Sequence, residues 1–411
     1  MEIVPLRSYP PFRGPRVPIA DAARTSGRVA GRIRSDGRGT WLVDASGEAR
    51  LTEVEPARAV DGDWVSGRLV VDGTTHRLVD VSVHAPRLAP PLDVALSGRL
   101  PLLHGRAEVV AAARRFFRDR GFLDVETPAR VPCPGLEPQL RAFPAGGELW
   151  LITSPELHLK RLVAAGAERV VEFARAFRDD ERGPWHRSEF LLVEWYRAFE
   201  GLEAIEADCE ALVRACAAAA GTTRVRDACD TGVPFERVTV REALGRATGL
   251  DLGDLDERES LARAVAARGH AIAPDDTWDE LFFRVWIAEV EPGLGWTRPV
   301  LVRDYPASQA ALARTRRESW GEVAERFELY IAGIEIANAF HELNDPVEQR
   351  RRHEADRAAR GAAGAPVYPL DERFLAALAA GMPPAAGIAL GLDRLAALLL
   401  GADSLDSIAP F

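Results

Sequence analysis

The sequence is poor in lysine, methionine and cysteine, and it has no long apolar run. Lys160 is the only lysine among 52 lysine and arginine residues, and the chain has two methionines and four cysteines. The four cysteines form no CxxC pair and lack zinc-ligand spacing; they are Cys133, Cys209, Cys216 and Cys229. This pattern favours reduced thiols in a cytoplasmic protein. No stretch is long enough to span a bilayer and the N-terminus has no apolar signal core, so no membrane partner is expected.

The charge balance is acidic. The formal net charge of −10 argues against a broad, non-specific grip on nucleic acid, although a local basic patch stays open. A length of 411 residues predicts two or three domains with a sizeable core. Codon usage that favours arginine, alanine and glycine explains the scarcity of lysine.

The N-terminal part reads as a small β domain. Residues 1–26 are rich in proline and arginine and are predicted to be a loose lead-in. Residues 27–83 contain five short strand patterns separated by Gly and Asp turns, which predict an OB-like β-barrel extending to residue 95 with a proline-rich linker at its end. Such barrels bind single strands through aromatic side chains, here Trp41 and Trp64. Acidic residues roughly balance the arginines in residues 27–83, so the barrel has no marked positive charge. A docking or vestigial module is therefore at least as good an interpretation as a nucleic-acid-binding one.

Residues 96–411 are predicted to form one larger domain. Helix patterns occur at 106–120 and from 153 onward, and short strands at 122–128 and 148–152. Glu156 falls in the first turn of the second helix. There it can complement the helix dipole, pair with Lys160 four residues on, or point toward a ligand amine.

The most informative stretch is a predicted hairpin over residues 177–196. A strand ends at Arg178, a charged loop carries His186, and the return strand places Phe190, Leu192, Glu194 and Tyr196 on one face. A buried Glu194 needs a cationic partner, and Arg178 and His186 offer donors to an anion such as a phosphate. The alternative is an ordinary hairpin in which Arg178 and Glu194 neutralise each other.

A second hairpin is predicted over residues 324–342. It is expected to bring Glu328, Glu335, Asn338 and Glu342 close together. Carboxylates gathered on strands repel one another unless a cation lies among them, and Mg²⁺ suits carboxylates beside a nucleotide. Solvated edges of a plain hairpin are the alternative.

The remaining segments are simpler. Residues 221–295 are predicted to be a mostly helical appendage without chemistry, in which the aromatic residues at 278, 282, 283 and 286 are core. Residues 346–360 are predicted to be a solvated, charged helix. Near the C-terminus, small residues at 387, 389 and 391 let a ligand lie against a strand, and Arg394 in the next helix can reach an anion.

These motifs together resemble the class II aminoacyl-tRNA synthetases of the lysine subgroup. The signature motifs appear in order: ETP at 126–128, the FR…H…F…E hairpin, and GLDR at 391–394. The segments TSPELHLKRL, EFLLVEWYR, PASQAALA, VAERFELY, GIEIANAFHEL and GIALGLDRL are similar to truncated paralogues that modify elongation factor P. The resemblance covers roughly residues 101–411 and implies an α+β fold, an antiparallel sheet flanked by helices, and a homodimer through the first motif.

The resemblance also implies a site for ATP and Mg²⁺. Arg178 would hold the α-phosphate, Phe190 would stack on adenine, and Arg394 would cover its other face or the γ-phosphate. Arg178 and Arg394 would be the catalytic residues, with magnesium at Glu328 and Glu335. The other implied nucleotide contacts are Asp179, Asp180, His186, Arg187, Leu329 and Gly391. The implied amino-acid pocket comprises Ser154, Pro155, Glu156, Glu194, Tyr196, Glu335, Asn338, Phe340, Glu342 and Ala389.

The implied reaction is activation of lysine or (R)-β-lysine as an adenylate, followed by transfer to a lysine side chain of elongation factor P. Lysyl-tRNA synthetases usually have Gly where this chain has Ala389, and the added methyl favours the β-amino acid. The chain departs from the family pattern at Asp180, which replaces Glu, and at Arg187, which replaces Asn. Two alternatives stay open: a lysyl-tRNA synthetase that acylates tRNA, and a catalytically inactive sensor of an amino acid or nucleotide.

Overall fold

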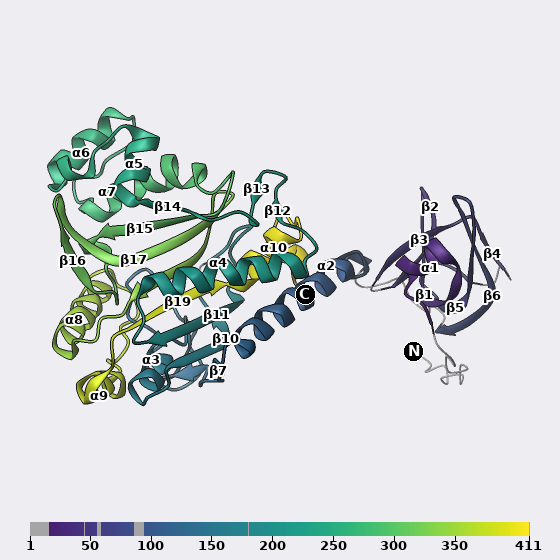
Figure 1. Ribbon diagram of the computed structural model, residues 1–411, viewed down its shortest axis with the longest axis horizontal. Helices are drawn as coiled ribbons and strands as arrows, with labels where there is room; N and C mark the ends of the chain where they lie inside the picture. The colour runs from purple at the N-terminus through teal and green to yellow at the C-terminus, as the bar shows by residue number, and fades with distance from the viewer. Residues whose placement is uncertain (1–15, 45, 56–58, 86–93, 180, 411) are drawn as a thin grey trace. The chain divides into compact units, whose positions relative to one another are not determined.

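The computed structural model describes residues 16–44, 46–55, 59–85, 94–179 and 181–410 (Figure 1). The chain divides into two compact units, one of Met1–Ala107 with Asp406–Phe411 and one of Glu108–Leu405. Helix α2 (Val94–Asp119) contains the boundary between them. Most of the predicted linker lies outside the described residues, and the predicted domain boundary at residue 95 stays a prediction.

The first unit contains a small curled sheet. Its strands are β1 (Gly27–Asp36), β2 (Gly39–Asp44), β3 (Gly47–Leu51), β4 (Glu53–Val54), β5 (Trp64–Asp72) and β6 (Thr75–Ala85), in the order β3-β2-β1-β5-β6-β4. One residue separates β3 from β4 in the chain, yet these strands lie at opposite ends of the order, so the sheet must curl toward closure. The predicted OB-like barrel is therefore consistent with the structure, with the two-residue β4 as an additional strand.

A helix in the predicted lead-in belongs to the barrel. Helix α1 (Ile19–Thr25) places Ile19 and Ala22, both fully buried, in the same core as Val29, Ile33 and Leu69. The prediction of a loose lead-in is wrong for this segment. Apolar residues spaced three apart form a helical stripe that the barrel interior covers.

The second unit is built on a nine-stranded, mostly antiparallel sheet. The order is β14-β15-β17-β18-β19-β11-β10-β7, with β16 beside β17, and only β7–β10 and β14–β15 pair in parallel. The strands are β7 (Leu123–Asp124), β10 (Arg169–Phe177), β11 (Glu189–Ala198), β14 (Glu236–Thr239), β15 (Val300–Pro306), β16 (Thr315–Glu318), β17 (Gly321–Ile331), β18 (Ile334–His341) and β19 (Ala385–Gly391). Two-stranded ribbons join β8 (Arg130–Val131) to β9 (Trp150–Leu151) and β12 (Arg224–Val225) to β13 (Cys229–Asp230).

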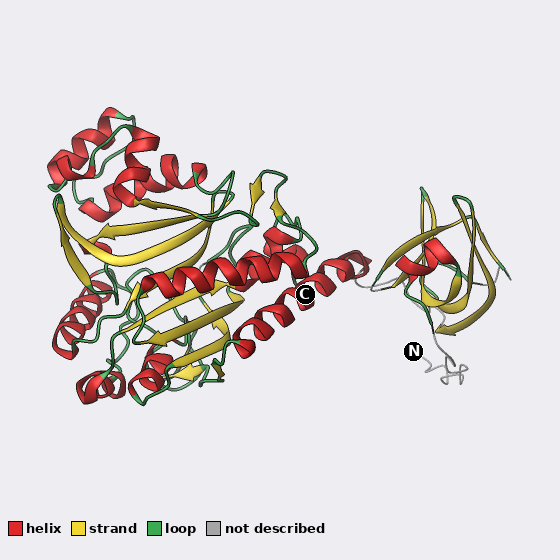
Figure 2. Ribbon diagram, in the orientation of Figure 1, coloured by secondary structure: helices red, strands yellow, loops and turns green. Residues whose placement is uncertain are grey.

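Helices flank this sheet (Figure 2). They are α3 (Glu156–Ala164), α4 (Leu202–Ala219), α8 (Pro346–Ala362), α9 (Glu372–Gly381) and α10 (Leu392–Leu399). The α+β architecture is therefore confirmed. None of the helices in the described part of the chain is long and apolar enough to cross a bilayer.

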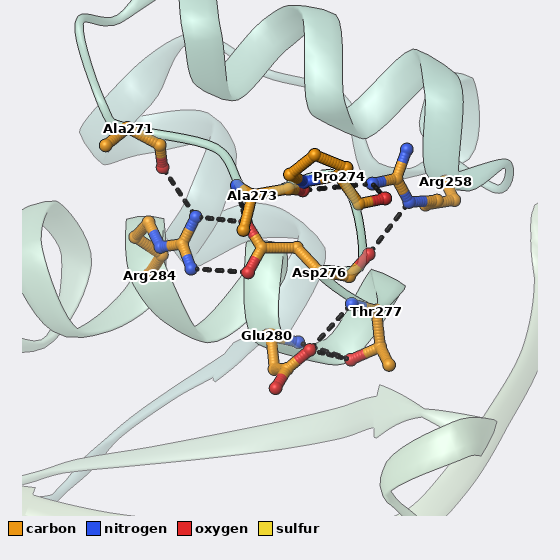
Figure 3. A network of polar contacts seen from close by, with 8 residues as sticks. All are labelled: Arg258, Ala271, Ala273, Pro274, Asp276, Thr277, Glu280 and Arg284. Atoms are coloured by element: carbon orange, nitrogen blue, oxygen red, sulfur yellow. Dashed lines mark hydrogen bonds and ion pairs between the residues drawn. The ribbon is translucent and has the colours of Figure 1, made fainter.

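The appendage of residues 221–295 is mainly helical, as predicted. Its helices are α5 (Val240–Thr248), α6 (Arg258–Ala267) and α7 (Trp278–Val285), but its residues 236–239 form β14 and extend the main sheet. A polar network closes the loop before α7 (Figure 3): Arg284 donates to both oxygens of Asp276, and Arg258 donates to the Asp276 carbonyl. Phe282 and Trp286 are 1% exposed and stack with centroids 5.5 Å apart, which confirms their predicted place in the core.

Helix α8 is not the solvated helix that its charge predicts. Gln349, His353 and Arg360 are buried. Arg360 donates to the carbonyls of Pro366, Glu137 and Leu140 and lies over the Tyr368 ring. Because the guanidinium satisfies three buried carbonyls, this helix fixes the loop that contains residues 137–140.

Candidate active site

A cavity of about 240 Å³ opens on one face of the central strands. Strand β19 lies between β11 and β18, and their pairing aligns Glu194, Ala389 and Asn338 in one row. Side chains in such a row project to the same side of the sheet. Trp195, the next residue on β11, packs against Phe117 instead, as strand alternation requires.

Arg178, Glu335 and Arg394 all line this cavity, although they come from three distant parts of the chain. The two hairpins and the C-terminal helix therefore converge as the sequence predicts. Nine other predicted site residues also line it: Ser154, Glu156, His186, Arg187, Phe190, Asn338, Phe340, Ala389 and Gly391. The specific roles of these residues stay predictions.

Arg178 is arranged to receive an anion. Its guanidinium lies over the Phe190 ring, 5.2 Å from the centroid, and makes contacts of 3.4 Å with the Thr153 carbonyl and with Glu181. These contacts are long and use few of its five N–H donors. Neutralisation of Arg178 by Glu194, the alternative drawn from the sequence, is not what the structure contains.

Arg394 is held at the start of α10. Its Nε donates to the Trp185 carbonyl over 2.9 Å and its Nη1 to the Glu335 carbonyl over 3.0 Å. Two backbone anchors fix the guanidinium at the cavity wall. Partial burial, and then the charge of Arg394, lowers the pKa of His186, so this imidazole is neutral at pH 7.

Glu335 and Glu328 form an acidic pair near Arg394. Burial, and then the neighbouring Glu328, raises the pKa of Glu335 to about 7. Glu328 does not line the cavity: it is 7% exposed and accepts hydrogen bonds from Tyr305, Tyr330 and Arg326.

This arrangement fits Mg²⁺ at Glu335, whose repulsion from Glu328 a cation would relieve. Glu328 could join as a second ligand only if Arg326 released it. Among the described residues there is no group of three or more His, Cys, Asp or Glu side chains that could hold a metal by themselves. Phosphate oxygens or water would therefore have to complete the coordination.

The predicted cluster of four residues on the second hairpin is in fact divided. Asn338 is paired with Glu328 across the strands, but Glu342 lies beside Lys160 and Glu156. The expectation that all four are close together is therefore wrong for Glu342. Glu335 on this hairpin lies near Arg394, whereas Glu342 at its end lies beside α3.

Glu194 is deeply buried without the cationic partner expected for it. It is 1% exposed and accepts hydrogen bonds from Ser154 over 2.8 Å and from Tyr196 over 2.6 Å. Burial, and then the charge of Glu156, raises its pKa to about 8. Protonation therefore avoids the cost of an unpaired buried charge at neutral pH.

Lys160, Glu156 and Glu342 form a compact ion cluster next to Glu194. The Lys160 ammonium lies 2.5 Å from Glu156 and 2.5 Å from Glu342. The expected Glu156–Lys160 pair is thus present, and Glu156 lines the cavity as well. Oε1 of Glu342 and Oδ1 of Asn338 are buried and accept no hydrogen bond within the described chain. Buried acceptors without donors fit a ligand that carries ammonium groups.

Several predicted site residues lie behind the cavity wall or outside the described structure. Pro155, Glu194, Tyr196, Glu328, Leu329 and Glu342 do not line the cavity. Leu329 is fully buried, so only its backbone could reach a nucleotide. The backbone of Asp179 is bridged to Arg141, and Asp180 lies outside the described residues.

Other cavity residues were not predicted from the sequence. The main ones are Glu137, Gln139, Glu181, Trp185, Arg326 and Asp393. Glu137 and Gln139 lie in an irregular loop, where no periodic pattern marks a residue. Arg326 alternates with apolar residues on β17, a pattern equally typical of a solvent-facing arginine. Asp393 accepts from the Leu191 N–H over 2.8 Å, a contact between residues 202 positions apart.

Binding of a diamine is expected to tighten as pH rises. Below a pKa of about 8 the empty site holds Glu194 protonated, whereas an ammonium group favours the ionised form, so binding releases a proton. Affinity for lysine should increase by up to about tenfold per pH unit from pH 6 to 8. Calorimetric titration with lysine over this range measures the effect. Glu194→Gln should bind weakly with a flatter profile, and a native affinity independent of pH would contradict the expectation.

The chain is similar to known proteins over most of its length. Residues 92–411 match the family described as "tRNA synthetases class II (D, K and N)". The chain is 38% identical over 327 residues to proteins named "Elongation factor P–(R)-beta-lysine ligase" from Salmonella paratyphi B, Salmonella schwarzengrund and Salmonella dublin. Each alignment covers 77% of this chain and 96% of the relative.

Proposed function

This chain belongs to the class II tRNA synthetase family of the D, K and N type, and we propose that it is an ATP-dependent ligase that attaches lysine or (R)-β-lysine to elongation factor P. The observation that carries the proposal is a cavity lined by Arg178, Arg394 and Glu156, with the buried acids Glu194 and Glu342 close to Glu156. Arg178 and Arg394 suit the phosphates of ATP. Glu156, Glu194 and Glu342 suit a substrate with two ammonium groups.

The first step joins the amino acid to AMP. An oxygen of the substrate carboxylate attacks the α-phosphorus in line, the bond to the β-phosphate oxygen breaks, and pyrophosphate leaves. Arg178 stabilises the negative charge on the α-phosphate while Phe190, under its guanidinium, offers a face to adenine. Mg²⁺ at Glu335, and at Glu328 if Arg326 releases it, would neutralise phosphate charge. Catalysis is therefore mainly positioning and electrostatics.

The second step transfers the acyl group. A lysine ε-amine of elongation factor P attacks the acyl carbon, AMP leaves, and the amine loses a proton as the amide forms. The acids around Glu194 hold the ammonium groups of the acyl substrate during the transfer, which keeps the reactive carbon beside Arg178. The three relatives bear the name of this activity, and it comes to this chain as part of the proposal.

The test is to incubate the protein with ATP and (R)-β-lysine or α-lysine, together with elongation factor P, and to measure intact mass. A gain equal to the amino acid less water is expected on elongation factor P. ATP–pyrophosphate exchange measured alongside isolates the first step. Exchange without a mass gain, together with charging of tRNA, would reject the acceptor but keep the adenylate chemistry.

A lysyl-tRNA synthetase is the second candidate, because the barrel carries two arginine–tryptophan stacks. Arg32 lies 5.4 Å from the ring centroid of Trp64, which is 41% exposed, and Arg34 lies 5.1 Å from that of Trp41. Such pairs suit stacked bases. If the protein catalyses no ATP–pyrophosphate exchange with either α-lysine or (R)-β-lysine, the inactive sensor becomes the explanation.

We also propose that the protein acts in the cytoplasm as a homodimer. Strand β7 is an edge of the main sheet, and Leu123 on it is 54% exposed. An exposed apolar side chain on an edge strand suits contact with a second copy. Four buried, free cysteines suit a reducing compartment.

Replacing Ala389 by glycine is expected to shift the substrate preference toward α-lysine. Ala389 lines the cavity between Glu194 and Asn338, so its methyl group narrows the floor on which the substrate lies. One methyl group provides about 1–3 kcal/mol of discrimination, so the ratio of kcat/KM for the two lysine isomers should change about tenfold or more. Pyrophosphate exchange with each isomer measures it, and an unchanged ratio would show that selectivity arises elsewhere.

A further inference from the structure

Lys160, the only lysine in the sequence, is a buried cation between two carboxylates. It lies on the buried face of α3, is 0% exposed, and its ammonium touches carboxylates from α3 and from the end of the second hairpin. A codon preference for arginine, the interpretation given above, does not account for a single lysine at a buried position. This lysine contacts Glu156, which lines the cavity.

The chemistry of the position requires a compact cation. A lysine ammonium is a point charge with three donors, whereas a guanidinium is a larger planar fork. Nζ lies 2.5 Å from each of Glu156 and Glu342, which leaves little room between the two carboxylates. Burial alone would lower the pKa of Lys160, but the two carboxylates raise it above its usual value, so the side chain stays charged.

We propose that Lys160 is a fixed internal counter-ion that positions Glu156 and Glu342 and sets the negative charge of the amino-acid pocket to match a diamine. This inference rests on the proposed function. Glu156, Glu194 and Glu342 together carry a formal charge of −3 when all are ionised. The ammonium group of Lys160 brings the net charge of the four side chains to −2. Two is the number of ammonium groups on lysine or β-lysine, whose carboxylate points to Arg178.

The other titratable groups around Lys160 do not change this balance. His353 on α8 is 3% exposed, and burial followed by the charge of Lys160 lowers its pKa to about 4, so it is neutral. Tyr196 on β11 is also neutral, because burial and then Glu194 hold its pKa well above the usual value. Glu137, in the loop fixed by Arg360, has a pKa raised by burial and then by Glu156.

Removing the cation should change how many protons the substrate displaces. Burial raises the pKa of Glu342 to about 8 even though Lys160 acts against the shift, so at pH 7 the empty pocket already holds a proton on Glu342. Without Lys160 the pKa of Glu342 would rise further, and Glu342 would stay protonated above pH 8. Above pH 8, where Glu342 of the native protein is ionised in the empty pocket, Lys160→Met should therefore release up to one proton more per lysine bound than the native protein. Its KM for lysine at pH 7 should be at least about tenfold higher, with the KM for ATP nearly unchanged.

The experiment is calorimetric titration of the full-length protein with lysine, above pH 8 and in buffers of different ionisation enthalpy, with pyrophosphate exchange measured in parallel. Lys160→Arg keeps the cation and should release the native number of protons even if its larger head raises the KM. The double variant E156Q/K160M restores the charge balance and should also return to the native number. Arg161→Met is the matched control, because Arg161 is the next residue on the same helix and has no ion pair with Glu156 or Glu342 in the described part of the chain.

The outcomes separate the inference from the proposed function. A native protein that neither binds lysine nor catalyses exchange would overturn the proposed function. Native activity with the same proton release in Lys160→Met would overturn the counter-ion role and leave Lys160 a packing residue. If Lys160→Met does not fold, Lys160→Arg and E156Q/K160M test the inference instead. If either variant releases one proton more or fewer per lysine bound than the native protein, the inference is overturned.

Discussion

Replacing Arg178 by alanine is expected to lower kcat/KM for lysine-dependent ATP–pyrophosphate exchange by about 10³-fold, or roughly 4 kcal/mol. Arg178 lines the cavity above Phe190 and makes only long contacts with protein groups. Its donors are therefore available to the charge that develops on the α-phosphate, where a preorganised cation acts without reorganisation.

The effect should fall on the chemical step rather than on stability. Arg178 makes two long polar contacts and lies over one aromatic ring, so thermal unfolding should change little. Arg182→Ala is the control, because Arg182 lies in the same loop, is exposed and does not line the cavity. If Arg178→Ala retained a tenth or more of native exchange activity, the α-phosphate role of Arg178 would be rejected.

Replacing Gly387 by alanine is expected to abolish lysine-dependent exchange, with a loss of at least about 100-fold. Gly387 lies on β19 between Tyr196 on β11 and Phe340 on β18. A Cβ there would overlap the Tyr196 ring and would lie 2.7 Å from Oε1 of Glu342. Tyr196 and Glu342 would both have to move, and neither has free space because both are buried.

The loss should be specific to the amino acid. Overpacking of this kind costs about 1–3 kcal/mol of stability, which a domain of this size can tolerate. Binding of ATP, measured by nucleotide-dependent protection in thermal unfolding, should persist because Arg178 and Arg394 lie elsewhere in the cavity. Gly361→Ala on α8 is the matched control, since its added methyl would meet only Val367 at 3.7 Å. Normal lysine activation in Gly387→Ala would refute the placement of the substrate beside Tyr196.

The fold was predictable to the extent that local patterns specify it. Alternation within residues 177–196 and 324–342 predicts the two hairpins, which the structure contains, because the side-chain period of a strand is two. Short pairings were missed where the pattern is too brief to detect, as for β14 and β16. Helix α8 was misjudged because its charged composition hides Arg360, whose buried position depends on carbonyls more than 200 residues away.

The site was predictable in its residue types but not in its partnerships. The sequence indicates that Glu194 is out of place in an apolar core and that Glu328 is one of several carboxylates on a hairpin. It does not indicate that Glu194 accepts hydrogen bonds from two hydroxyl groups and is protonated. Nor does it indicate that Glu328 accepts hydrogen bonds from two tyrosines and Arg326. A charge on a strand predicts that some partner exists, whereas the identity of that partner depends on which strands are neighbours.

The sequence by itself determined the family, the two hairpins and the acids and arginines that they carry, because motif spacing and strand alternation are local properties of the chain. Only the tertiary structure decided that Glu342 joins Lys160 and Glu156 rather than Glu335, and that Gly387 has no room for a methyl group. Those outcomes follow from strand order: β19 enters between β11 and β18, and this brings together side chains that are far apart in the sequence. Charge balance in the pocket is therefore a property of the sheet, not of any one segment.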